Sequence, residues 1–129
     1  MANHTHLFRP GEPVTFSAEA AVTGGRLVMV SGDRQVSPAT AKAAEWVGVA
    51  AYDAAIGEDV AVLVGGVQRI LASGAVVAGE IVVAATDGKV IKLAAVTTPT
   101  AADVTDTRAI VGIALTGGTD VPVEIALSR

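Results

Sequence analysis

The stretch that decides the fold is GRLVMVSGDRQV, residues 25–36, because it returns later in the chain as GEIVVAATDGKV, residues 79–90. The two copies align without a gap. Each begins with glycine, places apolar residues at matching positions, and has a turn aspartate before a second short apolar run. A repeated unit made of short β-type runs is typical of a structural scaffold.

The repeat continues in two further pairs of segments. VGVA, residues 47–50, matches VGIA, residues 111–114. DVAVLV, residues 59–64, then matches DVPVEI, residues 120–125. The matched segments occur in the same order in both copies, so the whole unit is duplicated rather than a single strand.

We therefore predict an internal repeat of residues 25–64 and 79–125, with two similar halves facing each other across a pseudo-two-fold axis. A glycine inside a strand marks a bend or a close approach of another backbone. The matched glycines Gly48 and Gly112 thus predict a matched bend. Such bends let a small sheet curl, and we expect the two copies to close one barrel together.

The composition favours strands over helices. The chain has 129 residues, of which 51% are hydrophobic but only 3% are aromatic, and valine is abundant. Branched side chains suit the pleated surface of a sheet. With frequent glycine turns, this predicts nine or ten short strands. The predicted fold class is all-β: a small β-barrel built from two similar halves, with an extended N-terminal arm and at most one or two short helical turns.

The length predicts one domain. Residues 1–13 are polar and contain two prolines, which exclude a central strand or helix there, so we expect an N-terminal arm followed by a single β-barrel domain at 14–129. An apolar pair, Leu7 and Phe8, interrupts the polar arm. Either this pair folds back on its own domain or it reaches a neighbouring protein.

Three local patterns make specific predictions. The runs at 59–64 and 67–71 flank Gly65 and Gly66, which predicts a hairpin. Residues 39–45 are the best helical stretch and predict one or two turns of helix. Residues 97–108 are small and polar and predict an exposed loop, with a short helical turn at 101–104.

The charges and the absence of cysteine exclude several classes of function. Without cysteine there is no disulfide framework, thiolate metal site or thiol catalysis. The net charge is −4, and no run of Lys or Arg is present, so we expect no nucleic-acid partner. No apolar stretch reaches the roughly 18 residues that a membrane-spanning helix needs, and the first residues lack the apolar segment of a secretory signal. We therefore expect no membrane partner.

His4 and His6 are the only histidines. Together with Asn3 they could touch a metal ion. Structural and catalytic zinc sites, however, use three or four fixed protein ligands. We predict no metal site and no histidine-dependent catalysis.

The acidic residues offer no clear catalytic pair. Five aspartates stand beside predicted turns, where aspartate is common for local hydrogen bonding: Asp33, Asp53, Asp59, Asp87 and Asp120. We predict a turn-forming role for each. A small hydrolase or isomerase would require two carboxylates sharing a pocket, so we predict no catalytic residue.

Trp46 and Tyr52 leave a different function open. Both rings could stack on a sugar, which would make the chain a small ligand- or glycan-binding β module. A lone tryptophan at the start of a strand is more often part of the core, and we predict that role for Trp46. A self-assembling shell or ring subunit with no larger partner is a further alternative.

Five motifs occur in a familiar order: FRPGEPVTF at 8–16, AVTGGRLVMVSGDR at 21–34, VGVAAYDAAIGEDVAVLVGGV at 47–67, ASG at 72–74 and VGIAL at 111–115. In this order and spacing they resemble the capsid cement, or head decoration, proteins of tailed bacteriophages, especially those that infect actinobacteria. The resemblance covers nearly the whole chain. The long connection at 94–108 departs from the family pattern.

The resemblance implies a β-tulip-like barrel that binds the outside of a phage head. Such proteins commonly sit as homotrimers at three-fold and quasi-three-fold positions, where they bridge major capsid protein subunits and stabilise the shell. It also implies a place on the capsid exterior of the virion after assembly in the host cytoplasm, with no enzymatic activity and no cofactor.

Attachment to a capsid would use the parts of the chain outside the repeat. In the arm we expect partner contacts from His6, Leu7, Phe8, Arg9 and Pro10, with the arm adding as a strand to a capsid sheet. The other expected partner loops are the connections in which the two copies differ, residues 37–45 in the first copy and 94–107 in the second. Their candidate contact residues are Lys42, Pro99, Asp103 and Asp106.

Overall fold

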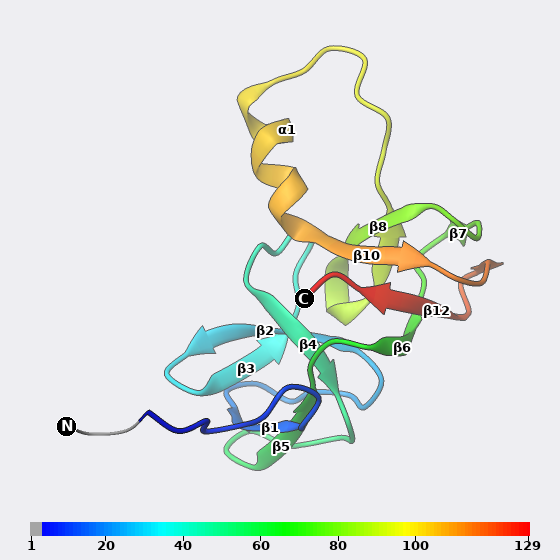
Figure 1. The fold of residues 1–129 in the computed structure, drawn as a ribbon. Helices are drawn as coiled ribbons and strands as arrows, with labels where there is room; N and C mark the ends of the chain where they lie inside the picture. The colour runs from blue at the N-terminus through cyan, green and yellow to red at the C-terminus, as the bar shows by residue number, and fades with distance from the viewer. Residues whose placement is uncertain (1–3) are drawn as a thin grey trace.

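The structure is a computed structural model that describes residues 4–129, apart from the side chain of Thr105. Within these residues the chain forms twelve strands, one α-helix and two 3-10 turns (Figure 1). The strands of the first half are β1 (Val14–Ala18), β2 (Leu27–Gly32), β3 (Gln35–Pro38), β4 (Trp46–Ala50) and β5 (Asp59–Leu63). The second half contains β6 (Val67–Leu71), β7 (Ala75–Val76), β8 (Ile81–Ala84), η1 (Thr86–Gly88), β9 (Val90–Lys92), α1 (Ala101–Asp106), η2 (Thr107–Ala109), β10 (Ile110–Ala114), β11 (Gly118–Thr119) and β12 (Pro122–Leu127).

The two halves have the same strand order. Strands β1-β3-β2-β4-β5 form a closed barrel in which β5 pairs back on β1. The second half is a five-stranded sheet in the order β6-β12-β10-β8-β9, with β7 and β11 as a small ladder beside it. Because the barrel is closed, its strands can also be written in the order β1-β5-β4-β2-β3. In this order they correspond one by one to β6, β12, β10, β8 and β9. The all-β fold, with a small barrel and two similar halves, is confirmed.

The correspondence extends to individual residue pairs. Leu27 lies opposite Val49 across β2 and β4, and Ile81 lies opposite Ile113 across β8 and β10. Each strand pair also contains one register shift at the same place. The halves therefore share not only topology but also the register that decides which side chains face which way.

The matched bend lies where the sequence predicts it. The shift in each half falls beside a glycine, Gly48 in β4 and Gly112 in β10. A Cβ on Gly48 would collide with the carbonyl oxygen of Leu63, and one on Gly112 with that of Ala126. Both glycines are needed because the neighbouring strand passes too close for any side chain.

The expectation that the two copies close one barrel together is wrong. The first half closes by itself, because β1 pairs with β3 in parallel through Ser17↔Gln35 and Ala18↔Val36. The second half has only an isolated parallel bridge at the equivalent place, Ala72↔Val90. Side chains of the first half pack against the inner face of this more open second sheet.

The last strand of the repeat aligns differently in the structure. Leu63 pairs with Val49, and Ala126 pairs with Ile113, so Leu63 corresponds to Ala126. The segment equivalent to 59–64 is therefore 122–127, and the match with 120–125 was two residues out of register. A two-residue shift leaves the alternation of faces unchanged, which is why the sequence pattern did not reveal it.

The predicted hairpin between 59–64 and 67–71 is also wrong. Strand β5 pairs with β1 and β4, whereas β6 pairs with β12. Gly65 and Gly66, with φ of 73° and 70°, turn the chain out of the first half and into the second. Each strand gains more by completing the apolar face of its own half than by pairing with its sequence neighbour. The hairpins β2–β3 and β8–β9 are confirmed.

Residues 39–45 are not helical, contrary to prediction; they form turns, with Lys42 at a left-handed φ of 59°. Burial of Ala39 and Ala43 between the halves outweighs the few hydrogen bonds that so short a helix could form. The short helix expected at 101–104 is confirmed as α1. No helix within residues 4–129 is long and apolar enough to cross a membrane.

Two apolar clusters form the core of the protein. One fills the closed barrel and includes Phe16, Val28 and Val60. The other lies between the halves, where Leu27 and Trp46 pack against the inner face of the second sheet. Because neighbours such as Leu27 and Val28 point to opposite faces, the start of strand β2 is buried on both sides. The second cluster makes the halves one packed unit.

Candidate functional site

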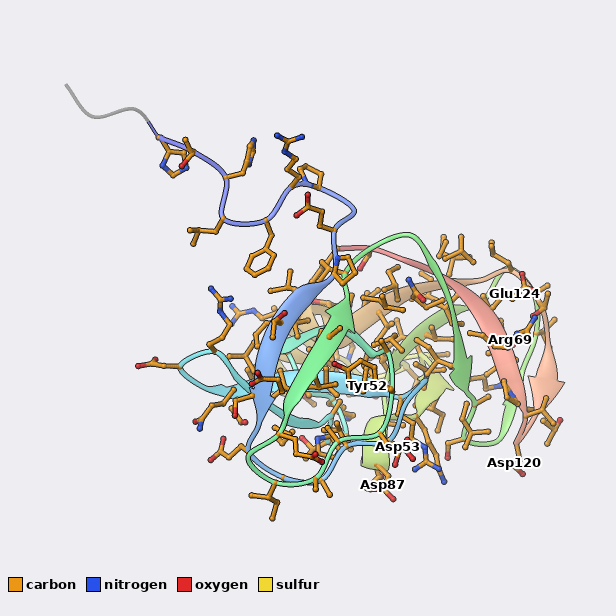
Figure 2. All side chains as sticks on the ribbon, turned by 90° about the horizontal axis from the view of Figure 1, so that it is seen from below. Tyr52, Asp53, Arg69, Asp87, Asp120 and Glu124 are labelled. Atoms are coloured by element: carbon orange, nitrogen blue, oxygen red, sulfur yellow. The ribbon has the colours of Figure 1, made fainter. Side chains whose placement is uncertain are left out.

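The N-terminal arm extends away from the barrel beside β1 (Figures 1 and 2). A turn at residues 9–12 joins it to the body. The Glu12 N–H donates to the Arg9 carbonyl at 3.0 Å, the Arg9 N–H donates to Glu12 Oε2 at 3.2 Å, and Gly11 has a φ of 86°. Proline followed by a left-handed glycine is the pattern of a type II turn, so Pro10 and Gly11 set the direction of the arm.

The apolar pair on the arm is divided between two environments. Phe8 turns back toward the barrel, where its ring centre lies 5.2 Å from the guanidinium carbon of Arg34. Leu7 points away and is 84% exposed. His6, Arg9 and Pro10 are exposed as well. The structure thus leaves one large apolar side chain of the arm without cover from its own domain.

The two unequal connections meet each other. Lys42 Nζ, from the connection after β3, lies 2.8 Å from Asp106 Oδ2 at the end of α1. The hydrogen bond from Lys42 to Asp106 and the charge of that carboxylate hold the pKa of Lys42 above its ordinary value, and the charge of Asp103 acts in the same direction. Asp103 Oδ2 also accepts the Thr100 N–H at 2.6 Å at the start of α1.

We call residues 94–107 the arch, because they rise from the end of β9, pass through α1 and return to β10 (Figure 1). A cavity of about 630 Å³ lies beneath it. Its lining includes the apolar side chains Val83, Ile91, Leu93 and Val96, and the charged side chains Lys42 and Asp106. Of the predicted loop residues, the arch brings together Lys42, Asp103 and Asp106, while Pro99 is exposed and lies outside the cavity lining.

Two of the predicted turn aspartates join distant loops. Asp53 Oδ1 accepts the Gly24 N–H, and Asp120 Oδ1 accepts the Gly74 N–H, each at 2.7 Å. Figure 2 shows Asp53 and Asp120 on separate parts of the surface. Asp87 occupies the turn η1, as predicted, with Arg26 at 3.8 Å. Asp53 and Asp120 therefore serve the scaffold and do not share a pocket.

Trp46 is a core residue, as predicted. It is 1% exposed, and its Nε1–H donates to the Ile110 carbonyl at 3.1 Å, across the boundary between the halves. Tyr52 is half exposed, and its hydroxyl oxygen accepts the Ala61 N–H at 3.3 Å. A sugar-stacking face made of both rings is therefore wrong, because Trp46 offers no surface to a ligand.

The described residues include no group of three or more histidine, aspartate or glutamate side chains placed to hold a metal ion. His4 and His6 are exposed on the arm, and Asn3 lies outside the described residues. Three other features of the described surface stand out: an arm with an exposed apolar side chain, the arch, and an apolar sheet face.

Pattern reasoning missed that sheet face. Ile81, Ile113 and Leu115 are 42%, 49% and 48% exposed on the outer side of the second sheet. The signal was hidden because residues 81–85 are apolar throughout, and a continuous apolar run does not reveal which side chains face outward.

Comparison with known proteins gives this scaffold a family. Residues 8–126 match the family model described as phage cement protein. Among solved structures, the head fiber gp8.5 N base of bacteriophage phi29 has the same fold, with a TM-score of 0.65 and 19% sequence identity over 91% of this chain and 93% of that chain. No curated protein sequence is a significant match. Because the family model spans most of its length, this chain belongs to the phage cement protein family.

Proposed function

We propose that this protein decorates the outer surface of a phage head, where it bridges adjacent major capsid protein subunits and stabilises the shell. Membership of the phage cement family supports this role. The observation that carries the proposal is the arm, which leaves the barrel and holds Leu7 with 84% of its surface exposed. Leu7 stands on an extended segment outside the barrel, and an apolar side chain on such a segment can enter a pocket of a partner when the segment pairs with a sheet edge.

The arm is the proposed anchor on the capsid. An extended segment can add to the edge of a sheet, so that main-chain hydrogen bonds supply affinity and side chains supply specificity. Leu7 would be the buried anchor of such a contact. Phe8 serves a second purpose, because its contact with Arg34 restricts the start of the arm against the barrel. His6, Arg9 and Pro10 complete the proposed contact.

The arch and the connection after β3 are the proposed secondary contacts. Lys42, Asp103 and Asp106 form one polar group at the base of the arch, and Pro99 lies apart from them. A fixed ion pair presents charges in a defined position, which favours specificity and orientation more than affinity.

The resemblance to head decoration proteins supports a homotrimer at three-fold and quasi-three-fold positions, on the capsid exterior of the virion after assembly in the host cytoplasm. The role requires neither an enzymatic activity nor a cofactor. The net charge of −4 and the scattered basic residues fit a protein partner better than a nucleic-acid partner.

Binding to capsids that lack the protein tests the proposal. Deletion of residues 2–9 is expected to abolish occupancy while the barrel remains folded, because residues 4–9 lie outside the two core clusters. Leu7→Ala should weaken occupancy by itself. Ile56→Ala is the matched control, because Ile56 is also a highly exposed apolar residue but lies in the turn before β5. Full occupancy by the deletion variant would contradict the proposed role of the arm.

A further inference from the structure

Each half carries an apolar side-chain pair at equivalent positions on its outer face, but only one of the two pairs is covered. In the first half, Leu27 and Val49 are 0% and 2% exposed, because the second half packs over them. Their equivalents in the second half, Ile81 and Ile113, are 42% and 49% exposed. The same register and the same face thus lead to burial in one half and exposure in the other.

The exposed pair belongs to a longer row. Ala126 lies opposite Ile113, and Val67 lies opposite Ala126. At the other end, the Leu93 N–H donates to the Ile81 carbonyl at 2.9 Å. We call these five residues the outer row. It runs across β6, β12, β10 and β8 to Leu93, which directly follows β9, without a charged side chain. The solvent face of an antiparallel sheet is usually polar.

The connection beside the row is also equivalent in the two halves. The Ala39 N–H donates to the Leu27 carbonyl at 3.0 Å, which reproduces the contact between Leu93 and Ile81. After Ala39, the connection contributes Ala43 to the cluster between the halves. In the second half the equivalent connection is the arch, whose apolar side chains Val96 and Val104 are exposed. The apolar pair and the connection that are buried at the boundary in the first half therefore both have exposed equivalents in the second half.

We propose that the outer row and the arch form a contact surface for a second copy of this chain. In the first half the equivalent surface is buried against the inner face of a β-sheet made of the same repeated unit, so a surface of this kind takes a β-sheet partner, and a second copy supplies one through its outer surface. Another copy is a partner that carries this unit. The inference deepens the self-association included in the proposed function by naming the face that makes it.

The charges beside the row suit a second copy. Arg69 and Glu124 lie opposite each other on β6 and β12 (Figure 2). The ion pairs of the described residues are Arg26–Asp87 and Lys42–Asp106 and do not include these two side chains. One positive and one negative group at the edge of the surface can each meet the opposite charge on another copy, which sets partner and orientation.

The contact must be smaller than the one between the halves. The first half of a second copy is a closed barrel and cannot open its interior to the outer row, as the second sheet does toward Leu27 and Trp46. Only outer surfaces can meet. Association in solution is therefore expected to be reversible and dependent on concentration.

Sedimentation analysis of the purified full chain over a roughly hundredfold range of concentration tests this inference. The wild-type protein is expected to associate, and Ile113→Glu to raise the dissociation constant by about tenfold or more. Ile56→Glu is the matched control, because it places the same charge on an exposed apolar position outside the surface, and it should associate like the wild type. If Ile113→Glu unfolds, Leu115→Gln on the same face replaces it.

A charge exchange gives an independent readout. Arg69→Glu alone should weaken association, and the double variant Arg69→Glu with Glu124→Arg should restore it, because each copy then again offers both charges. A wild-type protein that stays monomeric throughout the range would overturn the inference. So would an Ile113→Glu variant that associates normally but no longer binds capsids, which would assign the face to the capsid and leave the proposed decorating function intact.

Discussion

The guanidinium carbon of Arg129 lies 4.4 Å from the centre of the Trp46 ring, although 83 residues separate the two in the sequence. The same guanidinium donates from Nη1 to the carbonyls of Trp46 at 2.6 Å and Ala44 at 2.9 Å, and from Nη2 to the carbonyl of Arg108 at 2.7 Å. One side chain thus fastens the start of β4 to the segment that leads into β10, and so joins the two halves.

Replacement of this arginine should loosen the boundary between the halves. Arg129→Ala removes three charge-assisted hydrogen bonds and a cation–π contact, and we expect it to lower the free energy of unfolding by about 1–3 kcal/mol. Arg129→Lys keeps the charge but lacks the planar fork that reaches three carbonyls, so it should recover less than half of the loss. Urea denaturation monitored by Trp46 fluorescence measures both. Full recovery by lysine would show that charge alone matters.

The paired glycines in the bent strands should be equally intolerant of a side chain. A Cβ at Gly48 or Gly112 would meet a backbone carbonyl oxygen of the adjacent strand, which cannot move without breaking the ladder. We expect Gly48→Ala and Gly112→Ala each to destabilise the protein by about 1–3 kcal/mol. Gly32→Ala is the control, because its Cβ would meet only the flexible side chain of Gln35, and its effect should stay within about 0.5 kcal/mol. Similar losses at all three positions would contradict this explanation.

Local patterns predicted the elements well because each strand and turn is fixed by nearby residues. The hairpin of β8 and β9 follows from two short apolar runs that flank the Asp87-Gly88 turn, and the bend in β4 follows from a glycine inside an apolar run. These features, together with the duplicated sequence, were enough to predict an all-β barrel with two similar halves.

Strand partners depend instead on contacts between distant segments. Gly65 and Gly66 look like a hairpin turn, but β5 and β6 each complete a different half. The helical pattern of 39–45 does not produce a helix, because the burial of Ala39 and Ala43 between the halves outweighs it. Nothing in the local sequence around Arg129 indicates a contact with Trp46, because the contact exists only after both halves have packed.

The candidate site was predicted only in part, because it too depends on contacts between distant segments. Lys42 and Asp106 were both singled out because they stand in the connections where the two copies differ. Their contact was not predicted, since they are 64 residues apart and belong to different halves. The outer row was not predicted because Leu27 and Val49, the equivalents of its central pair, are core in the first half, so its exposure is a property of the packing and not of the pattern.

The ion pair between Lys42 and Asp106 should make the arch sensitive to alkaline pH. Asp106 raises the pKa of Lys42, so the pair stabilises fully below the ordinary lysine pKa of about 10.4 and is lost as the pH rises through the higher value of the folded state. Lys42→Met should therefore lower the melting temperature slightly at neutral pH, and the difference from the wild type should vanish in strongly alkaline buffer. The effect should also shrink in high salt, because the Lys42 side chain is largely exposed. A difference that persists at alkaline pH would point to lost packing of the lysine stem.

The arch should be dispensable for folding although it is proposed to serve in contacts. Apart from Thr105, whose side chain is not described, no side chain of residues 94–107 is fully buried, and neither core cluster includes one. Replacement of the arch by the shorter connection of the first half, residues 39–45, should leave the cooperative thermal transition in place, since loop length affects stability only weakly. The same variant should lose self-association, because Val96 and Val104 are removed while the outer row remains. Loss of the cooperative transition would contradict this prediction. It would show that the arch is part of the scaffold and that the two halves need it to fold.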